Sequence, residues 1–282
     1  MTEKRTGFLL SPKQREHHAA LETTVMGILN VTPDSFSDGG RYLNHEKAFA
    51  QARQMIDEGA GILDVGGEST RPGYTEVSSD EEVNRIILVV ETLCSWGDVP
   101  VSVDTYKAET AEKALQAGAT LVNDVWGLQK DPLMADVVAA YNAEIVIMHN
   151  RSSIDANIKI VDDMLRFFEY SLKKAQKAGI ASEKIILDPG IGFGKTHNQN
   201  REALCHITRL KDLGYPVLVG VSRKSFIGHI TGSSVQERLA GTLAAHLYAV
   251  RQGADIVRVH DVKAHCDALK IQNILETGQV IA

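Results

Sequence analysis

The chain has 282 residues, 44% of them hydrophobic, and a formal net charge of -6 at pH 7. This length suits one large domain, because α/β barrels commonly use about 250 residues. An acidic chain without a lysine- or arginine-rich run is not typical of nucleic-acid-binding proteins, so we expect no nucleic-acid partner.

Three cysteines, Cys94, Cys205 and Cys266, lie far apart in the sequence and lack the spacing of metal ligands. A small, odd set of cysteines is typical of a reducing compartment, so we expect a cytoplasmic protein. The apolar run GFLL near the N-terminus is too short for a signal peptide, and no run reaches the length of a transmembrane helix. We therefore expect no membrane partner.

Eight short apolar runs, each bounded by Gly, Pro or Asp, recur along the chain. They cover residues 25–31, 61–67, 100–105, 120–125, 144–150, 184–190, 216–222 and 255–261. β-branched residues are frequent in these runs, which is typical of strands that are buried on both faces of a parallel sheet.

Helical patterns lie between the apolar runs. Residues 46–59 repeat apolar side chains on one face, and Ser79 followed by Glu82 fits a capping box that opens the next helix. Longer amphipathic patterns cover 160–178 and 235–251, and shorter ones follow the third, fourth, sixth and eighth runs.

Eight strands alternating with helices predict an α/β fold, a closed (β/α)8 TIM barrel in a single domain. An open doubly wound sheet is the alternative, but such a sheet usually has fewer strands. We expect the barrel to cover residues 25–282. Residues 1–24 form a separate N-terminal segment, and the sequence leaves open whether this segment caps the bottom of the barrel.

Polar residues end all eight predicted strands. In chain order they are Asn30, Asp64 with Glu68, Asp104, Asn123 with Asp124, His149 with Asn150, Asp188, Ser222 with Lys224, and Arg258 with His260. At any single position a turn or a helix cap explains Asn, Asp or Ser equally well. Eight such ends in succession, with His, Lys and Arg among them, instead predict an active site, because these strand ends meet at one mouth of a barrel.

The side chains at the strand ends indicate the kind of ligand. Asp104, Asn123 and Asp188 carry flat hydrogen-bonding groups that suit a planar heterocycle with amino and ring N–H groups. Positive charge suited to a phosphate or diphosphate comes from Lys224, Arg258 and His260. We therefore expect a heterocycle joined to a phosphorylated group.

Residues 190–196, GIGFGKT, end like a phosphate-binding P-loop. The P-loop motif requires glycine at position 189, where this chain has Pro189. We interpret the segment as a glycine-rich loop after the sixth strand and do not expect an ATP site.

Seven motifs follow one another with ordinary spacing between about residues 25 and 262. They are NVTPDSFSDGG (30–40), DVGGESTRPG (64–73), DTYKAE (104–109), NDVWG (123–127), LDPGIGFGKT (187–196), SRKSFIG (222–228) and RVHD (258–261). Together they resemble the bacterial dihydropteroate synthase family. The resemblance implies a (β/α)8 barrel that condenses a dihydropterin-methyl diphosphate with 4-aminobenzoate in folate biosynthesis, giving 7,8-dihydropteroate and diphosphate. It also implies Mg²⁺ as cofactor, a homodimer, and a target of sulfonamides.

The resemblance implies roles for individual residues. The pterin would be read by Asp104, Asn123 and Asp188, with Lys224 at its edge and bordering the aminobenzoate site. The pterin ring would be walled by Val125, Met148 and Phe193, although these apolar residues could equally be ordinary core. The diphosphate would be held by Asn30, Arg258 and His260. Asn30 would also be a ligand for Mg²⁺, and Ser225 would lie near the aminobenzoate carboxylate.

Two loops complete the implied site. In the first, Phe36 would cover the aminobenzoate ring and Asp38 would face the reacting centre. The second would carry Ser69, Thr70, Arg71 and Pro72. The residues implied to act in catalysis are Asp38, Arg71, Asp104 and Lys224. An aniline nitrogen is a weak nucleophile, so we expect an SN1-like loss of diphosphate.

Three alternatives stay open on the sequence. A methyltetrahydrofolate–corrinoid methyltransferase-like protein would share the pterin-reading residues but would not use the diphosphate cluster. An inactive pterin-binding or scaffold protein would not need the full set of charged residues. An unrelated phosphosugar barrel enzyme would bind no pterin.

Overall fold

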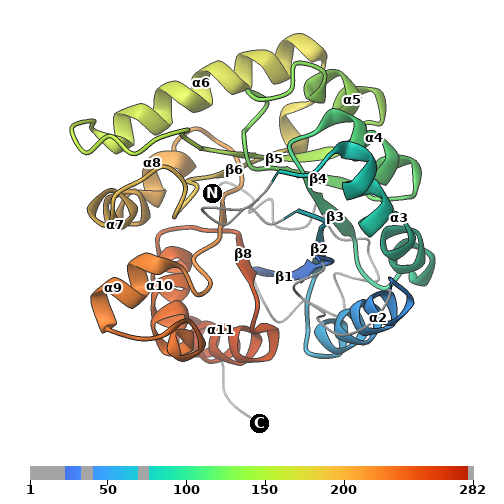
Figure 1. Cartoon of the computed structure of the whole chain (residues 1–282). Helices are drawn as coiled ribbons and strands as arrows, with labels where there is room; N and C mark the ends of the chain where they lie inside the picture. The colour runs from blue at the N-terminus through green and yellow to red at the C-terminus, as the bar shows by residue number, and fades with distance from the viewer. Residues whose placement is uncertain (1–22, 33–40, 69–75, 279–282) are drawn as a thin grey trace.

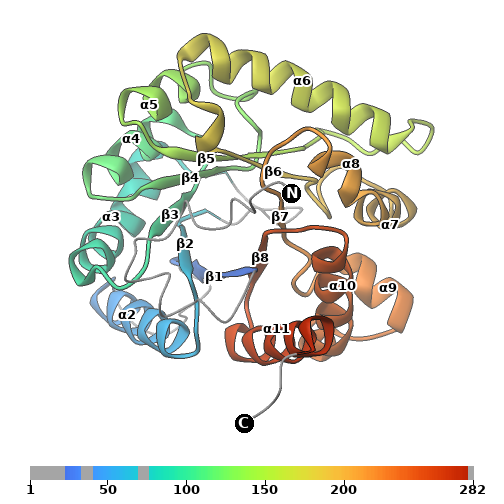
Figure 2. The same cartoon turned by 180° about the vertical axis from the view of Figure 1, so that it is seen from behind.

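The protein is described by a computed structural model, which covers residues 23–32, 41–68 and 76–278, with the backbone alone at 41–44. In this part of the chain, eight parallel strands form one sheet in the order β6-β5-β4-β3-β2-β1-β8-β7. A parallel bridge between Leu187 and Val217 joins the two ends of this order, so the sheet closes. The predicted (β/α)8 barrel is confirmed (Figures 1 and 2).

The strands are short and almost entirely buried. They are β1 (Thr24–Asn30), β2 (Ile62–Gly66), β3 (Val101–Asp104), β4 (Leu121–Asp124), β5 (Glu144–Met148), β6 (Ile185–Asp188), β7 (Leu218–Val219) and β8 (Ile256–Val259). Seven of them lie within the predicted runs, and β1 begins one residue before its run. Of the expected N-terminal segment, residues 1–24, only residues 23 and 24 belong to the described part of the chain.

Helices surround the strands on the outside of the barrel (Figures 1 and 2). They are α2 (Arg41–Asp57), α3 (Ser79–Trp96), α4 (Ala108–Gln116), α5 (Met134–Ala140), α6 (Ile160–Ala178), α7 (His197–Cys205), α8 (Ile207–Lys211), α9 (Ser225–Thr231), α10 (Leu239–Arg251) and α11 (Val262–Thr277). None of the helices in the described ranges is both long and apolar enough to cross a membrane.

Two predicted helix starts are wrong. The N-cap of α3 is Ser78, whose hydroxyl oxygen accepts a hydrogen bond from the Glu81 amide at 3.2 Å, whereas Ser79 is already helical. The predicted helix 235–251 is a short 3₁₀ turn followed by α10. Ser234 and Glu237 form a capping box at the start of that turn, and α10 begins separately at Leu239.

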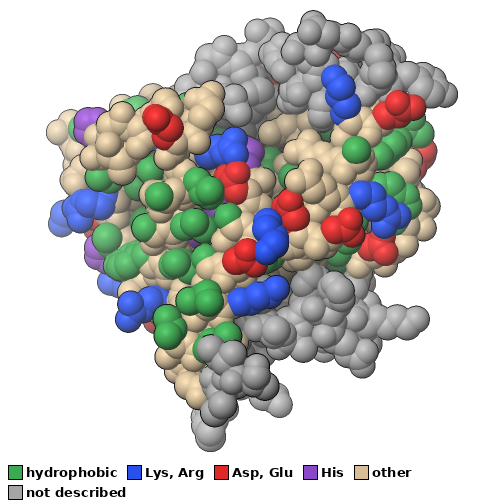
Figure 3. Space-filling view, turned by 90° about the horizontal axis from the view of Figure 1, so that it is seen from below, with side chains coloured by type: hydrophobic (Ala, Val, Ile, Leu, Met, Phe, Trp, Pro, Cys, Tyr) green, Lys and Arg blue, Asp and Glu red, His purple; other side chains and the backbone are tan. Residues whose placement is uncertain are grey.

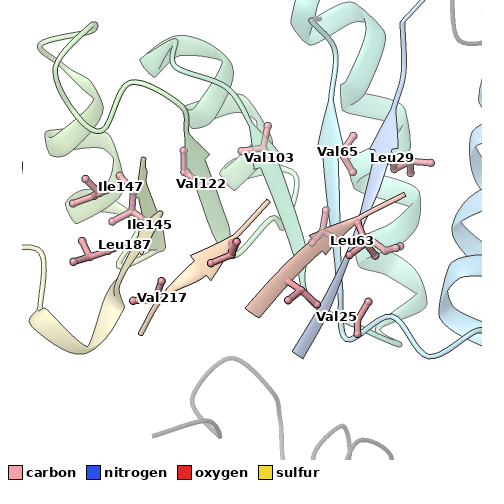
Figure 4. Close-up of a cluster of buried hydrophobic side chains, with 14 of the residues drawn as sticks. Val25, Leu29, Leu63, Val65, Val103, Val122, Ile145, Ile147, Leu187 and Val217 are labelled. Carbon is pink, nitrogen blue, oxygen red and sulfur yellow. The ribbon is translucent and has the colours of Figure 1, made fainter. Parts of the chain in front are cut away.

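Side chains alternate along the strands between the barrel interior and the layer under the helices. Outward residues such as Leu63, Val65 and Val103 belong to the large core cluster in Figure 4. A separate apolar cluster consists of Met26, Ile62, Leu121, Val146, Ile186, Leu218 and Ile256. Two residues beyond five of these, and so on the same face, come Asp64, Asn123, Met148, Asp188 and Arg258. The alternation therefore places a polar layer directly above an apolar one.

The cap of α3 gives a test of the helix start. We expect Ser78→Ala to lower the free energy of unfolding by about 1 kcal/mol, because the Glu81 amide loses its acceptor. Urea titration of both variants against wild type measures the difference. Ser79→Ala serves as the matched control and should have the smaller effect; the reverse order would contradict the cap seen at Ser78.

Candidate active site

A partly buried arginine lies between two buried carboxylates at the C-terminal end of the barrel. Arg258 on β8 donates from Nε to Asp64 Oδ2 at 2.5 Å and from Nη2 to Asp104 Oδ2 at 2.6 Å. Asp64 is 0% exposed and Asp104 is 6% exposed, so both carboxylates have lost most of their hydration. Burial alone would lower the pKa of Arg258, but the two carboxylates raise it above its ordinary value. The arginine therefore stays charged and balances the two acids.

Several buried acceptors of this cluster have no hydrogen-bond partner among the described residues. Asn123 donates from Nδ2 to Asp64 Oδ2 at 3.0 Å. The acceptors left without a donor are Asp64 Oδ1, Asp104 Oδ1 and Asn123 Oδ1. Because buried polar atoms are almost always paired, these acceptors indicate a binding site for a group with several N–H donors.

Asp188 at the end of β6 adds a further carboxylate. Its Oδ1 accepts a hydrogen bond from the Gly190 amide at 2.7 Å. Burial raises the pKa of Asp188 to about 6, although the Gly190 amide and the positive charge of Lys224 oppose the shift. The same lysine opposes the rise in the pKa of Asp104 that burial causes, so its charge acts on both acids.

Lys224 also contacts the apolar wall of the mouth. Its Nζ lies 4.2 Å from the centre of the Phe193 ring, which is within cation–π distance. Phe193 and Trp126 pack against a buried cluster formed by Tyr106, Val125 and Met148. The structure thus brings the three predicted ring-contact residues together beside the polar cluster.

His260 lies at the β8 end, close to the segment after β7. The Ser222 hydroxyl is 2.9 Å from His260 Nδ1, and it accepts a hydrogen bond from the His260 amide at 3.2 Å. Arg223 and Asp261 form an ion pair at 2.5 Å between the same two segments. Ser225 is exposed and is the first residue of α9. These bonds connect the segment that carries Lys224 to the β8 end.

Two buried histidines add a second chain of hydrogen bonds between the segment after β7 and the β8 end. The Val221 amide donates to His246 Nε2 at 3.1 Å, so His246 must carry its proton on Nδ1. That proton faces His265 Nε2 at 2.9 Å, and His265 then donates from Nδ1 to the Asp261 carbonyl oxygen at 2.7 Å. Both rings are therefore neutral, each with one defined tautomer.

Other predicted strand-end residues have structural partners. Asp124 accepts hydrogen bonds from the amides of Trp126 and Leu128, as a turn-capping residue does. His149 faces Asp163 at 3.2 Å, and burial lowers the pKa of His149 to about 4. Asn150 donates to the Val125 carbonyl oxygen. A turn therefore accounts for Asp124, whereas His149 and Asn150 are held by contacts with α6 and with the segment after β4.

Glu68 likewise takes part in a buried ion cluster under the mouth. Lys107 forms ion pairs with Glu68 and, at 2.9 Å, with Glu82. The Tyr106 hydroxyl lies 3.2 Å from Glu68 and 2.7 Å from Glu76. This cluster joins the ends of β2 and β3 to α3.

Three residues of the mouth were not selected from the sequence. Asp64 ends a predicted strand, but the sequence assigns it no role in ligand binding. Its position two residues after inward-facing Ile62 is the signal that could have selected it. Tyr106 and Trp126 gave no signal, because an aromatic residue in a loop is equally typical of core. The implied loop residues Phe36, Asp38, Ser69, Thr70, Arg71 and Pro72 lie outside the described residues.

Asn30 is the residue expected to bind Mg²⁺. Its Oδ1 and Asp104 Oδ2 lie 3.7 and 3.8 Å from the point that a Cβ at position 66 would occupy, so both oxygens lie near Gly66. The described residues contain no group of three or more His, Cys, Asp or Glu side chains suited to a metal. Mg²⁺ commonly takes only one or two protein oxygens and completes its shell with water and substrate phosphates. The side-chain oxygen of Asn30 fits this kind of Mg²⁺ coordination.

The sequence resembles known enzymes over most of its length. Residues 26–260 match the family described as pterin binding enzyme. The dihydropteroate synthase of Clostridium beijerinckii is 47% identical over 262 residues, covering 93% of this chain and 97% of that protein. The dihydropteroate synthase of Bacillus subtilis is 51% identical over 242 residues, covering 86% and 85% respectively.

Solved dihydropteroate synthases share the fold. The Clostridium difficile enzyme, crystallised in the presence of pteroic acid, has a TM-score of 0.87 at 50% identity, covering 90% of this chain and 96% of that one. The Xanthomonas albilineans enzyme with 4-aminobenzoic acid has a TM-score of 0.87 at 44% identity, covering 90% and 93%. The same enzyme in complex with 7,8-dihydropteroate has a TM-score of 0.83 at 42% identity, covering 90% and 94%.

The buried histidine pair predicts sensitivity to acid. Burial lowers the pKa of His246 and of His265, so below about pH 6.5 the unfolded chain takes up protons that the native protein does not. Stability is therefore retained above that pH and lost as the pH falls toward the lowered pKa values. We expect wild type to lose about 1.4 kcal/mol more per pH unit, between pH 6 and 5, than His246→Gln.

Urea titrations at several pH values measure this difference in slope. His206→Gln, which replaces an exposed histidine, is the control and should follow wild type. Parallel slopes for wild type and His246→Gln would show that the pair does not stay neutral in the native protein.

Proposed function

The chain belongs to the dihydropteroate synthase family of pterin-binding enzymes, as a transferase of folate biosynthesis, and we propose that it condenses (7,8-dihydropterin-6-yl)methyl diphosphate with 4-aminobenzoate to give 7,8-dihydropteroate and diphosphate. One observation carries the assignment of the site. Buried acceptors that have no donor among the described residues surround Arg258, at the end of the barrel where the enzymes of this fold bind substrate.

The pterin would occupy the polar cluster and the apolar wall together. A pterin ring carries an amino group and ring N–H groups along one edge, and carboxylate or amide oxygens accept from such donors. The accepting residues would be Asp104, Asn123 and Asp188, joined by Asp64. The flat faces of the ring would contact Val125, Met148 and Phe193. Lys224 would lie at the ring edge and border the aminobenzoate site.

The diphosphate would lie beside the pterin at the β1 and β8 ends. Arg258, His260 and Asn30 come from these two strand ends, and β1 and β8 are hydrogen-bonded neighbours. Arg258 would share its charge between the acids beneath it and the diphosphate. Asn30 would hold Mg²⁺ through its amide oxygen, and the ion, when bound, supplies positive charge to the departing group.

The reaction would begin with loss of diphosphate. The bond between the pterin methylene carbon and the diphosphate oxygen breaks, and the electron pair leaves with the diphosphate. The methylene and the ring then share a positive charge, which anionic Asp104 and Asp188, with Asp38 from the first loop, would stabilise. The aniline nitrogen of 4-aminobenzoate attacks the methylene carbon and afterwards loses a proton to water. No residue needs to act as a general base before the attack.

The aminobenzoate site would be completed by residues near the mouth and by the two loops. Ser225 at the start of α9 would lie near the carboxylate of 4-aminobenzoate, next to Lys224. The family resemblance assigns the remaining contacts to the loops. They are Phe36, Thr70, Arg71 and Pro72, with Arg71 and Asp38 also acting in catalysis.

A homodimer in the cytoplasm belongs to the same proposal. Figure 3 shows hydrophobic side chains gathered on the side of the face where α9, α10 and α11 lie. On α10 and α11, Tyr248, Ile271 and Leu275 are 41%, 60% and 77% exposed, and exposed apolar side chains gathered on one side favour a partner subunit. All three cysteines are free, which supports a reducing compartment.

The activity is tested by following diphosphate release from (7,8-dihydropterin-6-yl)methyl diphosphate with Mg²⁺. We expect release that is greatly accelerated by 4-aminobenzoate, with formation of 7,8-dihydropteroate. Omission of 4-aminobenzoate and omission of Mg²⁺ are the controls. Tight pterin binding without any release would instead favour a methyltransferase-like or inactive pterin-binding protein.

Two aspartate variants test the division of roles. Asp188→Ala should lose pterin affinity and turnover together, because Asp188 would accept hydrogen bonds from the ring. Asp38→Ala should lose turnover but nearly keep pterin affinity, because Asp38 would act only on the charge that develops at the methylene. Titration with a fluorescent pterin and steady-state turnover separate the two effects. An equal loss of affinity in both variants would contradict this division.

A further inference from the structure

Lys195 is a buried cation that the proposed reaction does not use. It ends the glycine-rich loop between β6 and α7 and is 4% exposed. Its Nζ donates to the carbonyl oxygens of Gly190 at 2.7 Å, Phe193 at 3.1 Å and His149 at 3.4 Å. An ammonium group has three N–H donors, so these three carbonyls take all of them. Among the described residues it forms no ion pair with a carboxylate.

The three carbonyls belong to two different strand ends. His149 directly follows β5, whereas Gly190 and Phe193 belong to the loop after β6. Gly190 has a φ of +63°, and a Cβ at this position would lie 1.8 Å from the His149 carbonyl oxygen. The loop backbone therefore packs directly on the end of β5, and the ammonium of Lys195 binds the two together.

The residues held in this way also contact the mouth. The Gly190 amide donates to Asp188 at 2.7 Å, and the Phe193 ring lies under the ammonium of Lys224 at 4.2 Å. Gly192, between them, packs on the Lys224 side chain, because a Cβ there would lie 3.0 Å from Lys224 Cδ. A shift of the loop would move both contacts at once.

We propose that Lys195 is a positioning residue for pterin binding: its ammonium fixes the β6–α7 loop on β5 and thereby holds Phe193 and the Gly190 amide in place against Lys224 and Asp188. This inference rests on the proposed function, because the pterin is the ligand that Phe193 and Asp188 would contact. Lys195 itself does not reach the substrate, since its three donors are engaged and its side chain is buried.

The protonation state of Lys195 gives the inference a distinctive property. Burial lowers the pKa of Lys195 to about 7, although Asp188 and Asp163 favour its charged form. Lys224 and Arg151 oppose that form, and His149, the other titratable neighbour, is neutral because burial lowers its pKa to about 4. A neutral amine has only two N–H donors and directs a lone pair at a carbonyl oxygen. The three hydrogen bonds from Lys195 to the carbonyl oxygens, which we call the clamp, are therefore complete below about pH 7 and weakened above it.

Two substitutions test the clamp in the full-length protein. Lys195→Met removes the cation at similar length, and Lys195→Arg keeps a cation that does not lose its proton. We expect Lys195→Met to raise the Kd for 6-hydroxymethylpterin by roughly ten- to a hundredfold, because binding would then have to order the loop that carries Phe193 and Gly190. Lys195→Arg should recover most of the loss. The effect should appear mainly in Kd and KM, with kcat less affected.

A matched control separates this role from a general loss of stability. Lys174 on α6 also donates to a backbone carbonyl, that of Leu128 at 2.9 Å, but neither residue is assigned a contact with the pterin. Lys174→Met should leave the Kd unchanged. Between about pH 6 and 8 the affinity of wild type should fall relative to Lys195→Arg, and the ratio of the two removes the titration of the ligand itself.

A second measurement uses wild type alone, so it does not depend on a variant that folds. Hydrogen exchange of the amides in residues 190–196, corrected for the intrinsic rate, should lose protection as the pH rises through 7, whereas amides of α6 around Lys174 should not. Unchanged pterin affinity in Lys195→Met, or protection of the loop that does not depend on pH, would overturn the inference alone. Wild type that binds no pterin would overturn the proposed function, and this role with it.

Discussion

The ion cluster of Arg258, Asp64 and Asp104 is the interaction on which the mouth of the barrel depends. Two nearly buried carboxylates on neighbouring strands would repel each other and would lose their hydration without compensation. The guanidinium of Arg258 binds one oxygen of each, and their other oxygens have no donor in the part of the chain that the structure describes. A single cation thus offsets the free-energy cost of burying the two carboxylates, and it leaves some of their oxygens available to a ligand. Removing it would leave two uncompensated charges in the interior.

The same arrangement explains how one small volume suits two unlike groups. The acceptors that remain around Arg258 favour a ring with several N–H donors, whereas the positive charges at the β7 and β8 ends favour an anion. Lys224 acts on both regions, because its charge lowers the pKa of Asp188 and its ammonium lies over the Phe193 ring. A substrate that consists of a heterocycle and a diphosphate would satisfy both regions at once, and departure of the anion would leave its positive partner beside carboxylates.

Local patterns in the sequence predict the eight strands and the polar residues at their ends, because strand alternation and strand ends are local properties. Asp104, Asn123, Asp188 and Arg258 were selected in this way. The patterns did not distinguish inward Asn123 from its neighbour Asp124, which caps a turn. The pairing of Arg258 with Asp64, 194 residues away, depends on barrel closure and has no local signal. Ser78 and Ser79 differ only in backbone conformation, so the cap could not be assigned from residue type.

The contact between the end of β5 and the β6–α7 loop has a consequence for inhibition. At position 190 even a methyl group would collide with the His149 carbonyl oxygen, so any other residue would displace the loop. A compound that gained its affinity from the backbone of this loop would contact a surface that substitutions in the enzyme cannot readily change. Escape from such a compound would have to arise at positions outside the backbone of this loop.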